Sequence, residues 1–156
     1  FDYGETSNYR DDDNNGAAQP ENANGDIENP SGVSENDNNT STAISAGGTE
    51  NLKVGYSLPP VDATATAYEM VFDITSIQIG KGSGSFGFSL VDSDGNELTD
   101  RQVLSTGENS YTFSPDENEA ISANSDDLYL ILDSQTKSNG NGNQELEIDY
   151  FELVVR

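Results

Sequence analysis

The chain has 156 residues, of which 29 are acidic and 6 are basic, so its formal net charge at pH 7 is −23. This charge argues against nucleic acid and anionic membranes as partners, because both would be repelled. The chain has no cysteine for disulfides or thiolate metal sites, and no histidine, the commonest general base and zinc ligand. No apolar run approaches the roughly 18 residues needed to cross a bilayer, so no membrane insertion is expected.

Residues 1–50 are poor in core-forming side chains and rich in asparagine, aspartate, glycine and serine. This composition alone is typical of disorder, and the alternative is a long irregular segment that packs on a β-core. Phe1, Tyr3 and Tyr9 favour packing, because a disordered tail rarely contains aromatics at this density. Ordering the segment costs about 1–2 kcal/mol per residue in backbone entropy, so we expect a bound cation to help order it.

From residue 51 onward, apolar and polar residues alternate in short runs separated by turn residues, which predicts strands. The predicted strands cover residues 52–58, 68–79, 86–90, 103–104, 111–113, 128–133 and 146–155. Asp94-Gly95 predicts a tight turn, and no stretch shows a helical period with caps. We therefore predict an all-β fold, an antiparallel β-sandwich in one domain over residues 1–156. Residues 1–50 would be its loop-rich N-terminal segment and residues 51–156 its main strand-forming core.

The last strand carries the strongest signal in the chain. Its sequence, ELEIDYFELVVR over residues 145–156, alternates up to Tyr150, after which the apolar set shifts phase to Phe151, Leu153 and Val155. A shift of one residue turns later side chains to the other face, so we expect a bulge or an interior position there. Residues 128–133 (LYLILD) are apolar on both faces, which predicts a second interior strand.

Several short motifs resemble carbohydrate-binding modules of families 6, 35 and 36. These motifs are Phe1-Asp2-Tyr3-Gly4, Tyr9-Arg10-Asp11, Asn14-Asn15-Gly16, Asp26-Ile27-Glu28, LSTGENSYTF over residues 104–113 and IDYFELV over residues 148–154. The resemblance implies a β-jelly-roll module of a secreted, extracellular protein. Such a module binds polysaccharide or a surface glycan without catalysis and often holds structural calcium.

The resemblance also implies a glycan site among loops at the end of the sandwich. Its aromatic residues would be Tyr9 and Tyr111, and its polar residue would lie near Asn143 or Glu147. A tyrosine ring can stack on a sugar while its hydroxyl forms hydrogen bonds, but tyrosines on strands are often core or rim residues instead.

Calcium would take oxygen ligands from acidic side chains. The run Asp11, Asp12 and Asp13 offers such oxygens, with a solvated acidic loop as the alternative, and Asp149 is a candidate by resemblance. Asp92, Asp94 and Asn96 superficially resemble half of an EF-hand loop, but Gly95 is wrongly spaced and we interpret the segment as a turn.

The chain departs from the family pattern in two ways. In the family pattern, a first strand should precede Phe1. Either a segment that carries this strand has been removed, or the sandwich lacks the strand and has an open sheet edge beside its neighbour. Tryptophan, the usual stacking platform, is absent. The open edge supports an alternative function, a self-assembling extracellular subunit of a fibre, surface layer or adhesin completed by a neighbour's strand. No motif singles out a catalytic pair among the many carboxylates, so we do not predict an enzyme.

Overall fold

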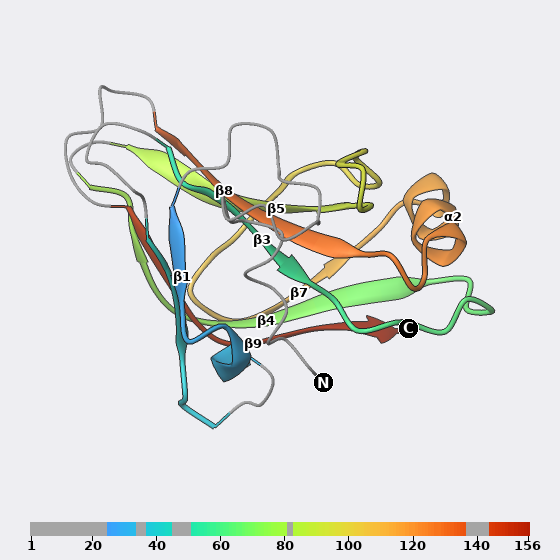
Figure 1. Ribbon diagram of the computed structural model, residues 1–156, viewed down its shortest axis with the longest axis horizontal. Coiled ribbons are helices and arrows are strands. Elements are labelled where there is room, and N and C mark those ends of the chain that lie inside the picture. The colour runs from blue at the N-terminus through green and yellow to red at the C-terminus, as the bar shows by residue number, and fades with distance from the viewer. Residues whose placement is uncertain (1–24, 34–36, 45–50, 81–82, 137–143) are drawn as a thin grey trace.

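The computed structural model describes residues 25–33, 37–44, 51–80, 83–136 and 144–156. Over these residues the chain forms two antiparallel sheets packed face to face, which confirms the predicted β-sandwich (Figure 1). Successive strands repeatedly change sheet along the chain, as in a jelly roll. No helix in the described part of the chain is long and apolar enough to span a membrane.

The five-stranded sheet contains, in spatial order, β1 (Asp26–Glu28), β2 (Ser41–Ile44), β9 (Glu145–Val155), β4 (Tyr68–Gln78) and β7 (Gly107–Thr112). The four-stranded sheet contains β3 (Lys53–Ser57), β8 (Tyr129–Thr136), β5 (Gly84–Val91) and β6 (Gln102–Val103). Two helical elements complete the fold, the 3-10 helix η2 (Pro30–Val33) and the α-helix α2 (Pro115–Ala123).

The two strands predicted to lie inside sheets do so. β9 pairs with β2 on one side and β4 on the other, and β8 lies between β3 and β5. Each is therefore hydrogen-bonded along both edges, and each contributes alternate apolar side chains to the core.

The five-stranded sheet begins before residue 51, where the sequence predicts no strand. β1 and β2 are short, and of their side chains Ile27 and Ala43 are buried, as is Val33 of η2. The alternation in these two strands is too brief, and too rich in serine and threonine, to stand out from the polar segment around it.

An aromatic cluster fills the space between the sheets. Phe72 of β4 packs on Phe88 of β5 with ring centroids 5.1 Å apart, and Tyr56 of β3 meets Phe151 of β9 edge-on at 5.1 Å. These are the separations that aromatic pairs prefer, and each pair links one sheet to the other.

The prediction of no helix is wrong at residues 115–123. Ser114 caps α2 in a capping box with Glu117, and Pro115 begins the first turn, where its missing N–H costs nothing. The helix closes one end of the sandwich (Figure 1). Buried Asn118 attaches it to the sheet, since its Oδ1 accepts the Tyr68 backbone N–H at 2.9 Å and its Nδ2 donates to the Phe113 carbonyl at 3.2 Å.

Candidate functional site

A bulge in β9 determines which side chains reach the outer face of the five-stranded sheet. Tyr150 lies opposite Asp73 of β4, and the next pair is Ile148 with Ile74, so Asp149 is the extra residue between them. Ile148 and Phe151 are both buried in the core. Because the bulge restores the inward position to Phe151, Tyr150 lies on the outer face, and the bulge expected from the phase shift is confirmed.

The pairing of β9, β4 and β7 then places polar residues in rows across that face. Tyr150, Asp73 and Glu108 form one row, because Asp73 lies opposite both of the others. Glu152, Val71 and Ser110 form the next row by the same rule. Together with Phe72 and Asn109, most of these residues line a cavity of about 320 Å³, which we name the β9–β4–β7 groove.

Tyr150 is the outward-facing aromatic side chain of this groove, because Phe72, which also lines it, is buried in the core. Its hydroxyl donates a hydrogen bond to Oε2 of Glu152. Partial burial, with the hydrogen bond to Glu152 and the charge of its carboxylate, raises the pKa of Tyr150 well above its ordinary value. The phenol therefore stays neutral, and the side chain presents an apolar ring beside the carboxylate of Glu152 and in one row with those of Asp73 and Glu108.

The turn before β7 is held by Asn109. Its Nδ2 donates to the carbonyls of Ser105 and Thr106 at 3.1 and 3.2 Å, and to that of Gly107 at 3.3 Å. Gly107 has a φ of 90°, a conformation that favours glycine. This turn fixes the start of β7 and with it the position of Glu108 in the groove.

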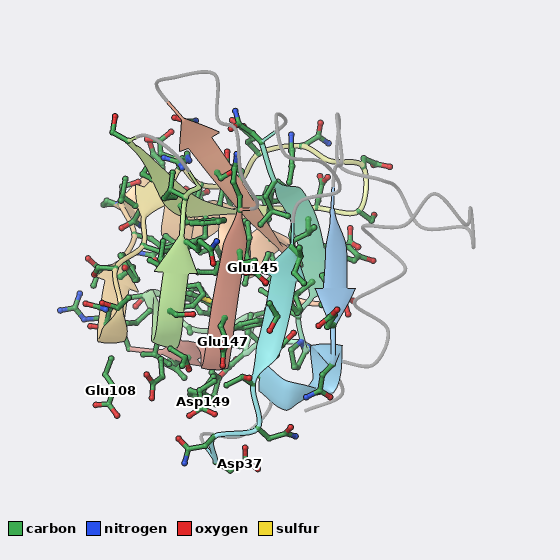
Figure 2. The ribbon with its side chains drawn as sticks, turned by 90° about the vertical axis from the view of Figure 1, so that its left-hand side faces the viewer. Asp37, Glu108, Glu145, Glu147 and Asp149 are labelled. Carbon is green, nitrogen blue, oxygen red and sulfur yellow. The ribbon has the colours of Figure 1, made fainter. Side chains whose placement is uncertain are left out.

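Acidic side chains continue along the same sheet. In Figure 2, Glu145, Glu147 and Asp149 follow one another along β9, with Glu108 to one side and Asp37 below. Oε1 of Glu147 accepts a hydrogen bond from Thr40 Oγ1 at 3.1 Å. Asp149 is only 3% exposed. The result is a face whose hydrogen-bonding groups are mainly acceptors.

The residues predicted from the sequence fall into separate places. Glu147 lies on this outer face, whereas Tyr111 of β7 is partly buried, packing edge-on against Phe72 at 5.8 Å and Phe88 at 5.1 Å. The structure therefore does not bring Tyr111 and Glu147 together. Tyr9, Asn143, Asp11, Asp12 and Asp13 lie outside the described residues.

Sequence reasoning missed Tyr150, Asp73 and Glu108 as site residues. The alternation in the sequence groups Tyr150 with the buried Leu146 and Ile148, because the phase shift comes after it, whereas the structure places the extra residue at Asp149 and so turns Tyr150 outward. Asp73 and Glu108 are brought to it by strand pairing, which the sequence does not reveal.

No protein-family model matches the sequence, and no match is found among curated proteins. Among solved structures, that of PfGH50B is similar with a TM-score of 0.50 and 14% identity, covering 85% of this chain and 22% of that one. A putative secreted protein from Parabacteroides distasonis has a TM-score of 0.34 and 10% identity, covering 72% of this chain and 38% of that one.

A glycoside hydrolase family 43 arabinoxylan arabinofuranohydrolase from Bacillus subtilis, in complex with cellotetraose, has a TM-score of 0.34 and 14% identity. That match covers 76% of this chain and 22% of the other. The chain thus spans well under half the length of each of these proteins. The similarity to PfGH50B supports the β-sandwich fold.

Proposed function

We propose that the chain is a non-catalytic, secreted carbohydrate-binding module that binds a neutral polysaccharide in the β9–β4–β7 groove. The observation that carries this proposal is the placement of the Tyr150 ring on the outer face, in one row with Asp73 and Glu108. The name of PfGH50B, which shares the fold, denotes a glycoside hydrolase and agrees with an association with carbohydrate.

The chemistry of the groove fits a sugar ring. The apolar C–H face of a pyranose stacks on a tyrosine ring, and Val71 extends that apolar surface. Asp73 and Glu108 accept hydrogen bonds from sugar hydroxyls, and charge-assisted bonds of this kind are the stronger ones. Polymers with carboxylate or sulfate groups would be repelled from this face, so the ligand of the groove is neutral.

The direct test is binding of cellohexaose, xylohexaose and mannohexaose by calorimetry. We expect wild type to bind at least one of them and Tyr150→Ala to weaken that binding by about fivefold, since loss of a stacking contact of about 1 kcal/mol corresponds to that factor. Tyr129→Ala is the matched control, because Tyr129 lies on β8 in the opposite sheet. Equal binding by Tyr150→Ala and wild type would refute the groove as the site.

The alternative function, a self-assembling subunit, would use a sheet edge. β3 and β7 are each hydrogen-bonded to one neighbouring strand among the described residues, so each has an edge that another chain's strand could extend. Light scattering in dilute solution separates the two functions, because a binding module is expected to be a monomer and a fibre subunit is not.

We also propose that calcium stabilises the module. The described residues alone do not form the site, since no three acidic side chains among them lie close enough together to hold a metal ion. The proposal therefore depends on Asp11, Asp12 and Asp13, with Asp149 as a further candidate ligand.

A further inference from the structure

The outer face of the four-stranded sheet carries a second cavity, of about 450 Å³, on the other side of the sandwich from the β9–β4–β7 groove. Its floor comes from β8 and β5, with Ile131 and Val91 as the apolar part. The loop between β5 and β6 contributes Glu97 and Asp100, and β3 contributes Lys53. We name this cavity the β3–β8–β5 groove.

One end of this groove is cationic. Lys53 lies opposite Asp133 across the β3–β8 pair, and Asp133 in turn lies opposite Gly87 of β5. Arg101 covers Gly87 and pairs with Asp133, Nε to Oδ1, at 2.6 Å. Lys53, Asp133 and Arg101 thus sum to one positive charge, in a chain with only 6 basic residues, although Glu97 and Asp100 bring the charge of the whole lining to −1.

The guanidinium of Arg101 is held in place. A Cβ added at Gly87 would lie 2.5 Å from Cζ of Arg101, so only glycine lets the side chain lie this close to the strand. Two of its nitrogens also donate to Oγ of Ser85 at 3.3 Å. A cation fixed in this way loses little entropy when it contacts a ligand.

Lys53 has no such partner. Its ammonium group makes no ion pair or hydrogen bond with any residue that the structure describes. All three of its N–H donors are therefore available to a ligand beside the fixed guanidinium.

The other end of the groove is acidic. Glu97 forms an isolated antiparallel β-bridge with Val91 of β5. Val91 lies four residues from Gly87 in the same strand, so the backbones of these two residues are about 13 Å apart at the rise of a strand. This backbone separation exceeds the Debye length of about 8 Å at physiological salt, so Glu97 only weakly opposes an anion near Gly87. Asp100 also lines the groove and directly precedes Arg101 in the chain, so it is the carboxylate that a bound anion would have to avoid. Between the two ends lie Ser89 and the apolar side chain of Ile131.

We propose that the β3–β8–β5 groove binds an acidic saccharide unit. Its carboxylate or sulfate group contacts Lys53 and Arg101, its ring lies over Ile131, and its hydroxyls donate to Asp100 and Glu97. The two sites of the sandwich would then have opposite charge preferences. This inference rests on the residues of the second groove and stands whether or not the first groove binds a glycan.

The test compares three probes by calorimetry at about 0.15 M salt, where charges beyond about 8 Å are screened. Trigalacturonate carries carboxylates, a 6-sulfated galacto-oligosaccharide carries sulfate, and galactotriose carries neither. We expect one or both acidic probes to bind about tenfold or more tightly than galactotriose, and whichever binds identifies the anionic group. Absence of binding by both acidic probes would overturn the proposal.

Two variants locate the binding. Lys53→Met keeps the aliphatic stem and should weaken acidic-probe binding about tenfold, because it removes the available cation. Arg156→Met is the matched control, since it removes one exposed positive charge from the end of the chain. An equal loss in both variants would mean that net charge alone attracts the probes. Binding of neutral hexasaccharides should be unchanged in Lys53→Met, which separates failure of this proposal from failure of the first.

Discussion

Tyr150 of β9 lies directly opposite Asp73 of β4, and Asp149 is the extra residue that separates this pair from Ile148 and Ile74. Without the extra residue, strict alternation would direct Tyr150 into the core beside Ile148. With it, Phe151 packs in the core and the tyrosine ring joins Asp73 and Glu108 on the outer face. One inserted residue thus produces both a filled core and a candidate binding surface.

Removal of the α2 cap should destabilise the domain. Ser114→Ala is expected to lower the free energy of unfolding by about 1 kcal/mol, because the Glu117 N–H loses its side-chain acceptor. Urea denaturation measures this, with the exposed Ser105→Ala as control. A cost no larger than that of the control would contradict a stabilising role for the cap.

The close approach of Arg101 to Gly87 should appear as an energetic coupling. Gly87→Ala is expected to cost about 1–3 kcal/mol, since the new methyl displaces the guanidinium from Asp133. In an Arg101→Ala background the same substitution should cost clearly less. A double-mutant cycle in urea measures the difference, and additive costs would show that the contact carries no coupling.

Stability should fall at alkaline pH in a way that depends on Tyr150. Because burial and Glu152 raise its folded pKa above the ordinary value of 10.0, its contribution is fully present below pH 10 and is lost as pH rises further. Tyr150→Phe should therefore show a shallower decline in unfolding free energy above pH 10 than wild type. Parallel declines would contradict the raised pKa.

Calcium should raise the melting temperature if the proposed ion binds only the folded chain. We expect exhaustive chelation to lower that temperature and replacement of Asp11, Asp12 and Asp13 by asparagine to abolish the response. Magnesium at the same concentration is the control for general screening of the net charge of −23. An identical melting curve with and without chelator would rule the ion out.

The sequence predicts a strand of this fold only where the alternation of apolar and polar residues continues over enough residues. The last strand alternates over enough residues to reveal its position and its bulge, and LYLILD reveals an interior strand. β1 and β2 are too short to show a period, although they complete the five-stranded sheet. In α2, only Asn118 and Ile121 are buried, so the helix shows no apolar period in the sequence. The capping box at Ser114 was the feature from which the helix could have been predicted.

The candidate site was harder to predict for a different reason. Asp73 and Glu108 belong to strands that pair only in the folded chain, and neither stands out among 29 acidic residues. The family resemblance points to Tyr111, and not to Tyr150, as a glycan-stacking residue. Tyr111 instead packs against Phe72 and Phe88 on the inner side of β7. Which face of a strand a residue occupies depends on register, and register is set by partners distant in sequence.

Binding of a neutral glycan in the β9–β4–β7 groove can be tested by amide chemical-shift mapping of the labelled protein during titration with neutral hexasaccharides. We expect the largest shifts to cluster at Val71, Asp73, Glu108, Ser110 and Tyr150, with little change on β3 and β8. Shifts confined to the loops at the end of the sandwich, with these five residues unmoved, would contradict it.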